Sequence, residues 1–69
     1  MTEATQLAEA AGSRDPEVGL RAVAALRRLL DQLEALQVAS ARRAGWSWQD
    51  IASVLGVTRQ AVHQKHRRR

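Results

Sequence analysis

The sequence predicts an all-α protein with a long N-terminal dimerisation helix followed by a compact C-terminal group of helices. Alanine, leucine and valine supply thirteen, eight and six of the 69 residues, and aromatic residues only 3%. This composition favours helices over strands. So short a chain without cysteine supports one small core, because disulfides are excluded. We therefore expect a second chain to contribute stability.

Segment 1–14 is expected to form a short helix or a tail. In a helix over 2–11, Ala4, Leu7, Ala8 and Ala11 would share one face, and Gly12 would end it. A single leucine is a weak anchor. The two alternatives are therefore docking against a neighbouring helix and fraying.

Segment 15–44 is expected to form one long helix. Asp15 suits the N-cap, Pro16 the first helical position and Glu17 the positive end of the helix dipole, and no breaker follows before Gly45. A helix over 16–44 would be about 43 Å long. Its apolar residues follow a heptad-like spacing that predicts self-association, although packing on the chain's own helices is the alternative. The predicted dimerisation residues are Val23, Leu26, Leu29, Leu30, Leu33 and Leu36.

Segment 45–66 is expected to form two short helices around a tight turn. Ser47 suits the first N-cap, with Asp50 as an imperfect capping-box partner and Trp46 placed to pack on Ile51. Gly56 would end the first helix. Thr58 would cap the second, over 59–66.

Charge is divided unevenly along the chain. Residues 1–40 hold six acids and four arginines, a balance of −2, whereas residues 41–69 hold one acid and seven bases, a balance of +6. This asymmetry predicts a half that associates and a half that meets a polyanion. Nucleic acid is the first candidate and a membrane surface the second.

The stretch from Gly45 to His63 resembles the helix-turn-helix of bacterial transcriptional regulators, most closely the variants in sigma factor region 4 and in site-specific invertases and resolvases. The resemblance covers about 20 residues and implies a motif core of Ile51, Ala52, Leu55, Gly56, Val57 and Val62. The preceding helix would complete a tri-helical DNA-binding head through Leu36, Val38, Ala39 and Ala41. Lys65 departs from the pattern, which usually has a buried residue there. Either its stem packs with the ammonium outward, or the helix ends early.

The resemblance also implies that helix 58–66 enters the major groove of double-stranded DNA. The expected base contacts are Arg59, Gln60, His63 and Gln64. The expected phosphate contacts are Ser47, Gln49, Thr58, Lys65, Arg67 and Arg68, the last two within a basic tail, 67–69. Arg42 and Arg43 either complement the helix dipole or contact phosphate.

We therefore expect a homodimeric, sequence-specific transcriptional regulator in the bacterial cytoplasm, at the nucleoid. An enzyme is not expected, since the chain lacks a phosphate-binding glycine loop and a carboxylate pair in its basic half. Neither a cofactor, a metal nor a membrane span is expected. The alternatives are a protein-interaction adaptor that uses the long helix and a sequence-tolerant nucleoid protein. Another regulatory protein is a further potential partner.

Overall fold

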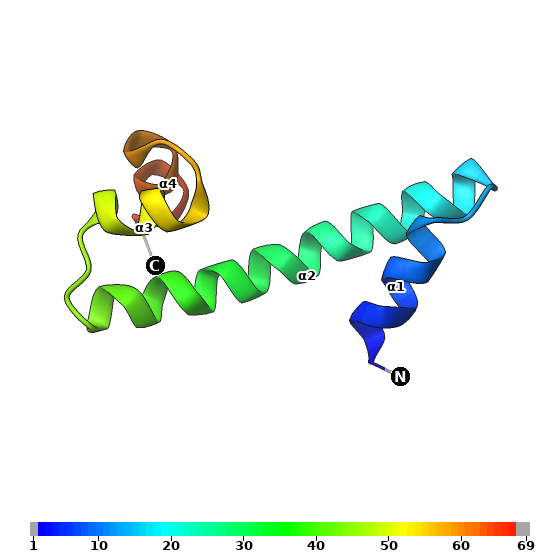
Figure 1. Cartoon of the computed structure of the whole chain (residues 1–69), viewed down its shortest axis with the longest axis horizontal. Coiled ribbons are helices and arrows are strands. Elements are labelled where there is room, and N and C mark those ends of the chain that lie inside the picture. The colour runs from blue at the N-terminus through cyan, green and yellow to red at the C-terminus, as the bar shows by residue number, and fades with distance from the viewer. Residues whose placement is uncertain (1, 68–69) are drawn as a thin grey trace. The chain divides into compact units, whose positions relative to one another are not determined.

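The computed structural model describes residues 2–67, and within that range it contains four helices and no strand (Figure 1). The helices are α1 (Glu3–Ala11), α2 (Pro16–Arg43), α3 (Trp48–Leu55) and α4 (Arg59–His66). The all-α prediction is confirmed. Contacts divide the chain into two compact units, Met1–Leu33 and Glu34–Arg69, with the boundary inside α2. We call them the N-terminal and C-terminal units and describe each by itself.

Helix α1 forms with a cap at each end. The Thr5 N–H donates to Thr2 Oγ1 (3.2 Å), and the Gly12 N–H donates to the Glu9 carbonyl oxygen (3.1 Å). The prediction of a helix here is confirmed, but the predicted packing face is only partly right. Leu7, with Ala10 and Ala11, is half-buried, whereas Ala4 and Ala8 are exposed.

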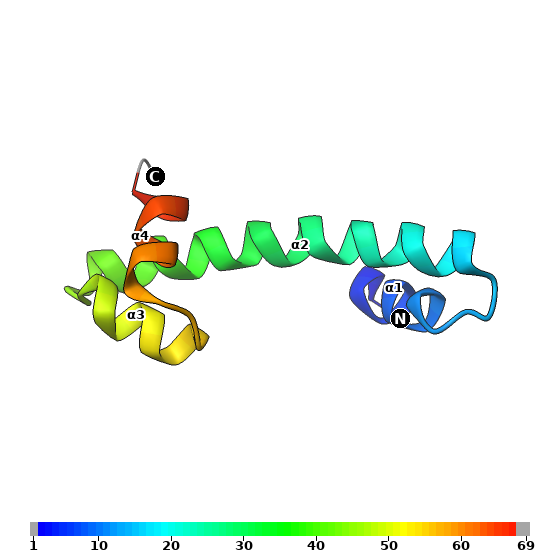
Figure 2. The ribbon, with the colours of Figure 1, turned by 90° about the horizontal axis from the view of Figure 1, so that it is seen from above.

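Helix α2 begins as the sequence predicts. Asp15 Oδ1 accepts the Glu17 N–H (3.0 Å), and Pro16 is the first helical residue. Figure 2 shows α1 beside the first turns of α2. A Cβ added at Gly19 would lie 3.5 Å from the Ala11 carbonyl oxygen. Gly19 and Ala22 are the only buried residues described in the N-terminal unit.

The predicted dimerisation residues of the N-terminal unit remain partly or largely uncovered. Leu30 and Leu33 are 61% and 48% exposed. Val23, Leu26 and Leu29 are half-buried. The described residues of this unit fully bury none of these five side chains.

The C-terminal unit has a core at the crossing of α2, α3 and α4. Val38, Ile51, Ala52 and Val62 are buried, and Ala41 and Trp48 pack against them. Ala52 is completely buried, as expected for a small residue where two helices approach closely.

Three predictions about this core are wrong. Leu36, Leu55 and Val57 are 66%, 42% and 48% exposed rather than buried. Leu36 stands two residues before Val38, about 200° around the helix, so the two side chains cannot face the same core. Leu55 and Val57 lie at the end of α3 and in the turn that follows, where no further described element of the unit covers them.

Candidate nucleic-acid interface

The start of α3 is fixed by a reciprocal pair of hydrogen bonds. The Asp50 N–H donates to Ser47 Oγ (3.0 Å), and the Ser47 N–H donates to Asp50 Oδ2 (3.0 Å). The shorter Asp50 side chain thus completes the capping box that the sequence predicts as imperfect. The hydrogen bonds from the Ser47 backbone and side chain lower the pKa of Asp50 below its ordinary value.

The two tryptophans occupy different environments. Trp46, predicted to pack on Ile51, is 42% exposed, whereas Trp48 packs against the core. Arg42 holds this region in place, because its Nη1 donates to the Trp46 carbonyl oxygen (2.9 Å) and its guanidinium lies 4.5 Å from the centre of the Trp48 ring. Through both contacts, Arg42 stabilises the turn that joins α2 to α3.

The turn between α3 and α4 depends on Gly56, which adopts a left-handed conformation (φ 74°, ψ 30°). The N–H groups of Gly56 and Val57 both donate to the Ala52 carbonyl oxygen, at 2.9 and 3.1 Å. Thr58 then caps α4 by accepting the Ala61 N–H (3.1 Å). The sequence predicted the turn and both caps, and all three are present.

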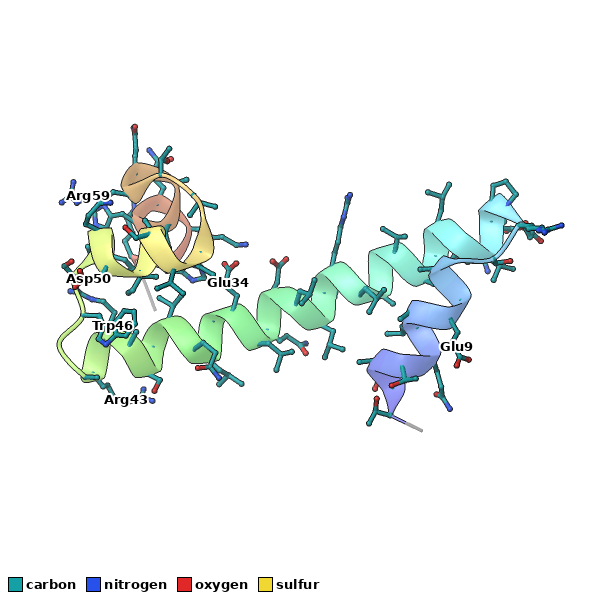
Figure 3. The ribbon with its side chains drawn as sticks, in the orientation of Figure 1. Glu9, Glu34, Arg43, Trp46, Asp50 and Arg59 are labelled. Atoms are coloured by element: carbon teal, nitrogen blue, oxygen red, sulfur yellow. The ribbon has the colours of Figure 1, made fainter. Side chains whose placement is uncertain are left out.

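Three of the four predicted base-contacting residues of α4 are exposed. Arg59, Gln60 and Gln64 are exposed, and Figure 3 shows Arg59 directed away from α2. His63 is half-buried, and its ring centroid lies 5.2 Å from that of Trp48. Helix α4 therefore exposes one guanidinium and two carboxamides.

The predicted phosphate-contacting residues are not equivalent. The hydroxyl oxygens of Ser47 and Thr58 accept cap N–H groups, and the Ser47 hydroxyl also hydrogen-bonds the Asp50 carboxylate. Gln49 Nε2 lies 3.3 Å from Ser53 Oγ, and Arg67 is exposed. Arg68 lies outside the described residues.

A cluster of Glu34, Lys65 and His66, which we call the Glu34 cluster, joins the end of α4 to α2 within the C-terminal unit. Glu34 Oε2 lies 2.6 Å from His66 Nε2 and 3.0 Å from Lys65 Nζ. His66 is only 2% exposed, and its Nδ1 has no hydrogen-bond partner among the described residues. Hydrogen bonding from Lys65, aided by His66, lowers the pKa of Glu34 despite partial desolvation.

The Glu34 cluster corrects the interpretation of Lys65. Helix α4 continues to His66 instead of ending early, and the Lys65 ammonium pairs with Glu34. The buried position is His66, one turn after Val62. The sequence held a signal for this contact, because Glu34, Val38 and Ala41 are spaced four and three residues apart on one face of α2.

Metal-ligating groups and membrane-spanning helices were also sought among the described residues. Within residues 2–67, no three metal-ligating side chains gather in one place, and no helix has the length and apolar character needed to cross a membrane. A shallow hollow of about 420 Å³ lies beside α3, lined by Ala44, Gly45, Trp46, Asp50, Ser53 and Val54. Comparison of the chain with models of protein families, with curated proteins and with solved structures finds no match.

Proposed function

We propose that this chain is a homodimeric transcriptional regulator that reads the sequence of double-stranded DNA with α4, in the bacterial cytoplasm. The observation that carries the proposal is the capped α3–turn–α4 arrangement closed over Ala52. It leaves Arg59, Gln60 and Gln64 exposed on one short helix. A helix presented in this way matches the width of the major groove.

The chemistry of the exposed face suits base edges. The Arg59 guanidinium makes two parallel donations to guanine, and the carboxamides of Gln60 and Gln64 both donate to and accept from adenine. The balance of +6 over residues 41–69 supplies the attraction to phosphate. Lys65 is not a phosphate contact in this proposal, because Glu34 holds its ammonium.

Dimerisation supports the same function. The exposed Leu30 and Leu33 on α2 are suited to pairing with a second copy. Two copies would place two α4 helices on half-sites about one helical turn, roughly 34–36 Å, apart.

A protein-interaction adaptor is the second candidate. It is favoured by Val54, Leu55 and Val57, which are 73%, 42% and 48% exposed beside the turn. Apolar side chains grouped in this way suit a protein surface better than a phosphate backbone.

The experiment that tests the proposal is selection of duplexes from a random pool, followed by binding measurements over a salt series. The expected dissociation constant for the selected duplex is lower by at least about 10³-fold than for a scrambled duplex of equal composition. Equal affinity for both duplexes, varying only with salt, would overturn sequence reading and leave sequence-tolerant binding. Binding no tighter than about 10⁻⁴ M to either would favour the adaptor.

A further inference from the structure

Glu34 is held in place by a buried partner. Its Oε2 lies 2.6 Å from Nε2 of His66, which is buried one turn after Val62 in α4. A buried ring nitrogen cannot exchange its protein partner for water without cost. The Glu34 side chain itself is 27% exposed, so its carboxylate can contact a second group as well. The structure thus fixes a partly exposed carboxylate beside the last turn of α4.

The His66 ring accounts for one contact of Glu34 without cancelling its charge. Nδ1 of His66 is buried and has no hydrogen-bond partner among the described residues. A proton on Nδ1 would be a buried donor without an acceptor, which favours the neutral ring with its proton on Nε2. The negative charge of Glu34 is therefore left to Lys65, whose Nζ lies 3.0 Å from the same Oε2.

Lys65 lies where a lysine of α4 could also reach the backbone of DNA. At 100° per residue, it stands about 100° around the helix from Gln64 and about 60° from the buried Val62, on the flank of the helix. In the proposed function Gln64 contacts a base edge, so this flank faces a wall of the major groove, which carries phosphates. The Lys65 side chain is 47% exposed. Glu34 and a phosphate would thus compete for one ammonium.

The residue type at position 65 suits such a competition. Lys65 is the only lysine among the eleven basic residues of the chain, and the other ten are arginines. A lysine ammonium is a compact charge with three donors on a flexible stem, whereas an arginine guanidinium is a rigid planar fork. An ammonium can therefore exchange one acceptor for another without a demand for a planar match.

We propose that Glu34 withholds the Lys65 ammonium from the DNA backbone and thereby limits the affinity of this chain for DNA of any sequence. The inference rests on the proposed function, because it takes double-stranded DNA as the ligand of α4, but it concerns phosphate contact and not base reading. Phosphate contacts carry no sequence information. Glu34 therefore lowers the affinity for the selected duplex and for unrelated duplexes by the same factor.

Binding of the full-length chain to the selected and the scrambled duplex over a salt series tests the proposal. Glu34→Gln keeps an oxygen that accepts from His66 but removes the charge that holds Lys65. It should tighten binding to both duplexes about 3- to 10-fold at low salt and steepen the slope of log affinity against log salt by about 0.9, the value of one further phosphate contact. The ratio of the two dissociation constants should stay within about two-fold of the parent ratio. A purely structural role for Glu34 predicts the opposite sign, because a loosened α4 would bind both duplexes more weakly.

Two further variants separate the release of Lys65 from the loss of a negative charge. Glu17→Gln is the matched control, because Glu17 is also an exposed acid paired with a basic side chain, Arg21 at 2.8 Å, but in the N-terminal unit. It should leave the salt slope unchanged. Lys65→Gln in the parent chain should change the slope by less than about 0.3, since the ammonium is not on a phosphate there. In the Lys65→Gln background, Glu34→Gln should lose its effect on the slope.

Three results would overturn the proposal: no tightening or a loss of affinity on Glu34→Gln, an effect of Glu34→Gln that persists without Lys65, or a slope lowered by about 0.9 in Lys65→Gln alone. The last result does not depend on how well Glu34→Gln folds, which far-ultraviolet circular dichroism checks. A parent chain that still prefers the selected duplex would leave base reading intact in all three cases. Equal binding of both duplexes, tightened by Glu34→Gln through Lys65, would do the reverse. Binding of neither duplex by the parent or by Glu34→Gln would refute both.

Discussion

The two units of this protein differ in which side chains they bury. The C-terminal unit buries Val38, Ile51, Ala52, Val62 and His66. The N-terminal unit buries only Gly19 and Ala22 among its described residues, and it leaves Leu30 and Leu33 61% and 48% exposed. The C-terminal unit closes a core within a single chain, although Leu36, Val54 and Val57 stay exposed there, whereas the N-terminal unit fully buries no large apolar side chain among its described residues.

This difference separates two sources of stability. A core completed within one chain has a stability that does not depend on protein concentration, whereas a face completed by a second chain gains stability by mass action. Both tryptophans, Trp46 and Trp48, lie in the C-terminal unit. Tryptophan fluorescence therefore follows that unit alone, and circular dichroism follows both.

The largest expected effect comes from the core of the C-terminal unit. Ile51→Ala should lower the free energy of unfolding by about 2–5 kcal/mol, because Ile51 is 4% exposed and its truncation leaves a cavity. Urea denaturation followed by tryptophan fluorescence measures it, at two protein concentrations ten-fold apart. Val54→Ala on the exposed side of α3 is the control and should change stability by less than about 0.5 kcal/mol. A midpoint that moves with concentration would remove the distinction between the units.

The Glu34 cluster should have the next largest effect. Glu34→Ala should cost the C-terminal unit about 1–3 kcal/mol, because it leaves the buried His66 Nε2 without its acceptor. Glu34→Gln keeps an acceptor oxygen and should recover part of the loss. Equal unfolding midpoints for the parent chain and Glu34→Ala would mean that the cluster does not hold α4.

Protonation of the Glu34 carboxylate at low pH should also lower the stability of the protein. The pKa of Glu34 is lowered in the folded protein, so its contribution is complete above the ordinary value of 4.5 and is lost as the pH falls through the lower folded value. The parent chain should therefore lose stability more steeply below pH 4.5 than Glu34→Gln does. Parallel pH profiles of the two proteins, measured by tryptophan fluorescence in urea, would contradict this assignment.

A smaller effect distinguishes the glycines that follow helices in the two units. Gly56 in the C-terminal unit has φ 74°, so Gly56→Ala should cost about 1–2 kcal/mol in backbone strain. Gly12 in the N-terminal unit has φ −86°, which alanine adopts freely, so Gly12→Ala should be neutral or slightly stabilising. Thermal unfolding followed by circular dichroism compares them. Equal shifts from both substitutions would show that the turn after α3 does not depend on its left-handed residue.

Local structure was predictable from the sequence because its determinants lie within a few residues of one another. Asp15, Ser47 and Thr58 each accept an N–H two or three residues ahead, and Gly56 provides the turn without help from distant residues. Helix boundaries consequently fall close to the predicted ones, with α2 ending at Arg43 rather than at residue 44.

Contacts between distant residues were not predictable in the same way. Glu34 and His66 are 32 residues apart, and their pairing depends on how α4 crosses α2. Periodicity alone did not show whether position 65 or 66 faces the core. The two positions follow the buried Val62 by three and four residues, and both therefore lie near its side of the helix. The resemblance to the helix-turn-helix likewise assigned Leu55 and Val57 to a core that does not extend over them.

The most direct test of the central claim is a comparison of the parent chain with Arg59→Ala on the selected duplex and on every single-base variant of it. Arg59 is exposed on α4 and is assigned to a base rather than to phosphate. The account predicts a loss of about 1–3 kcal/mol on the selected duplex and relaxed discrimination at one base position in each half-site. An equal loss of affinity for all the duplexes, including the scrambled one, would contradict base reading by α4.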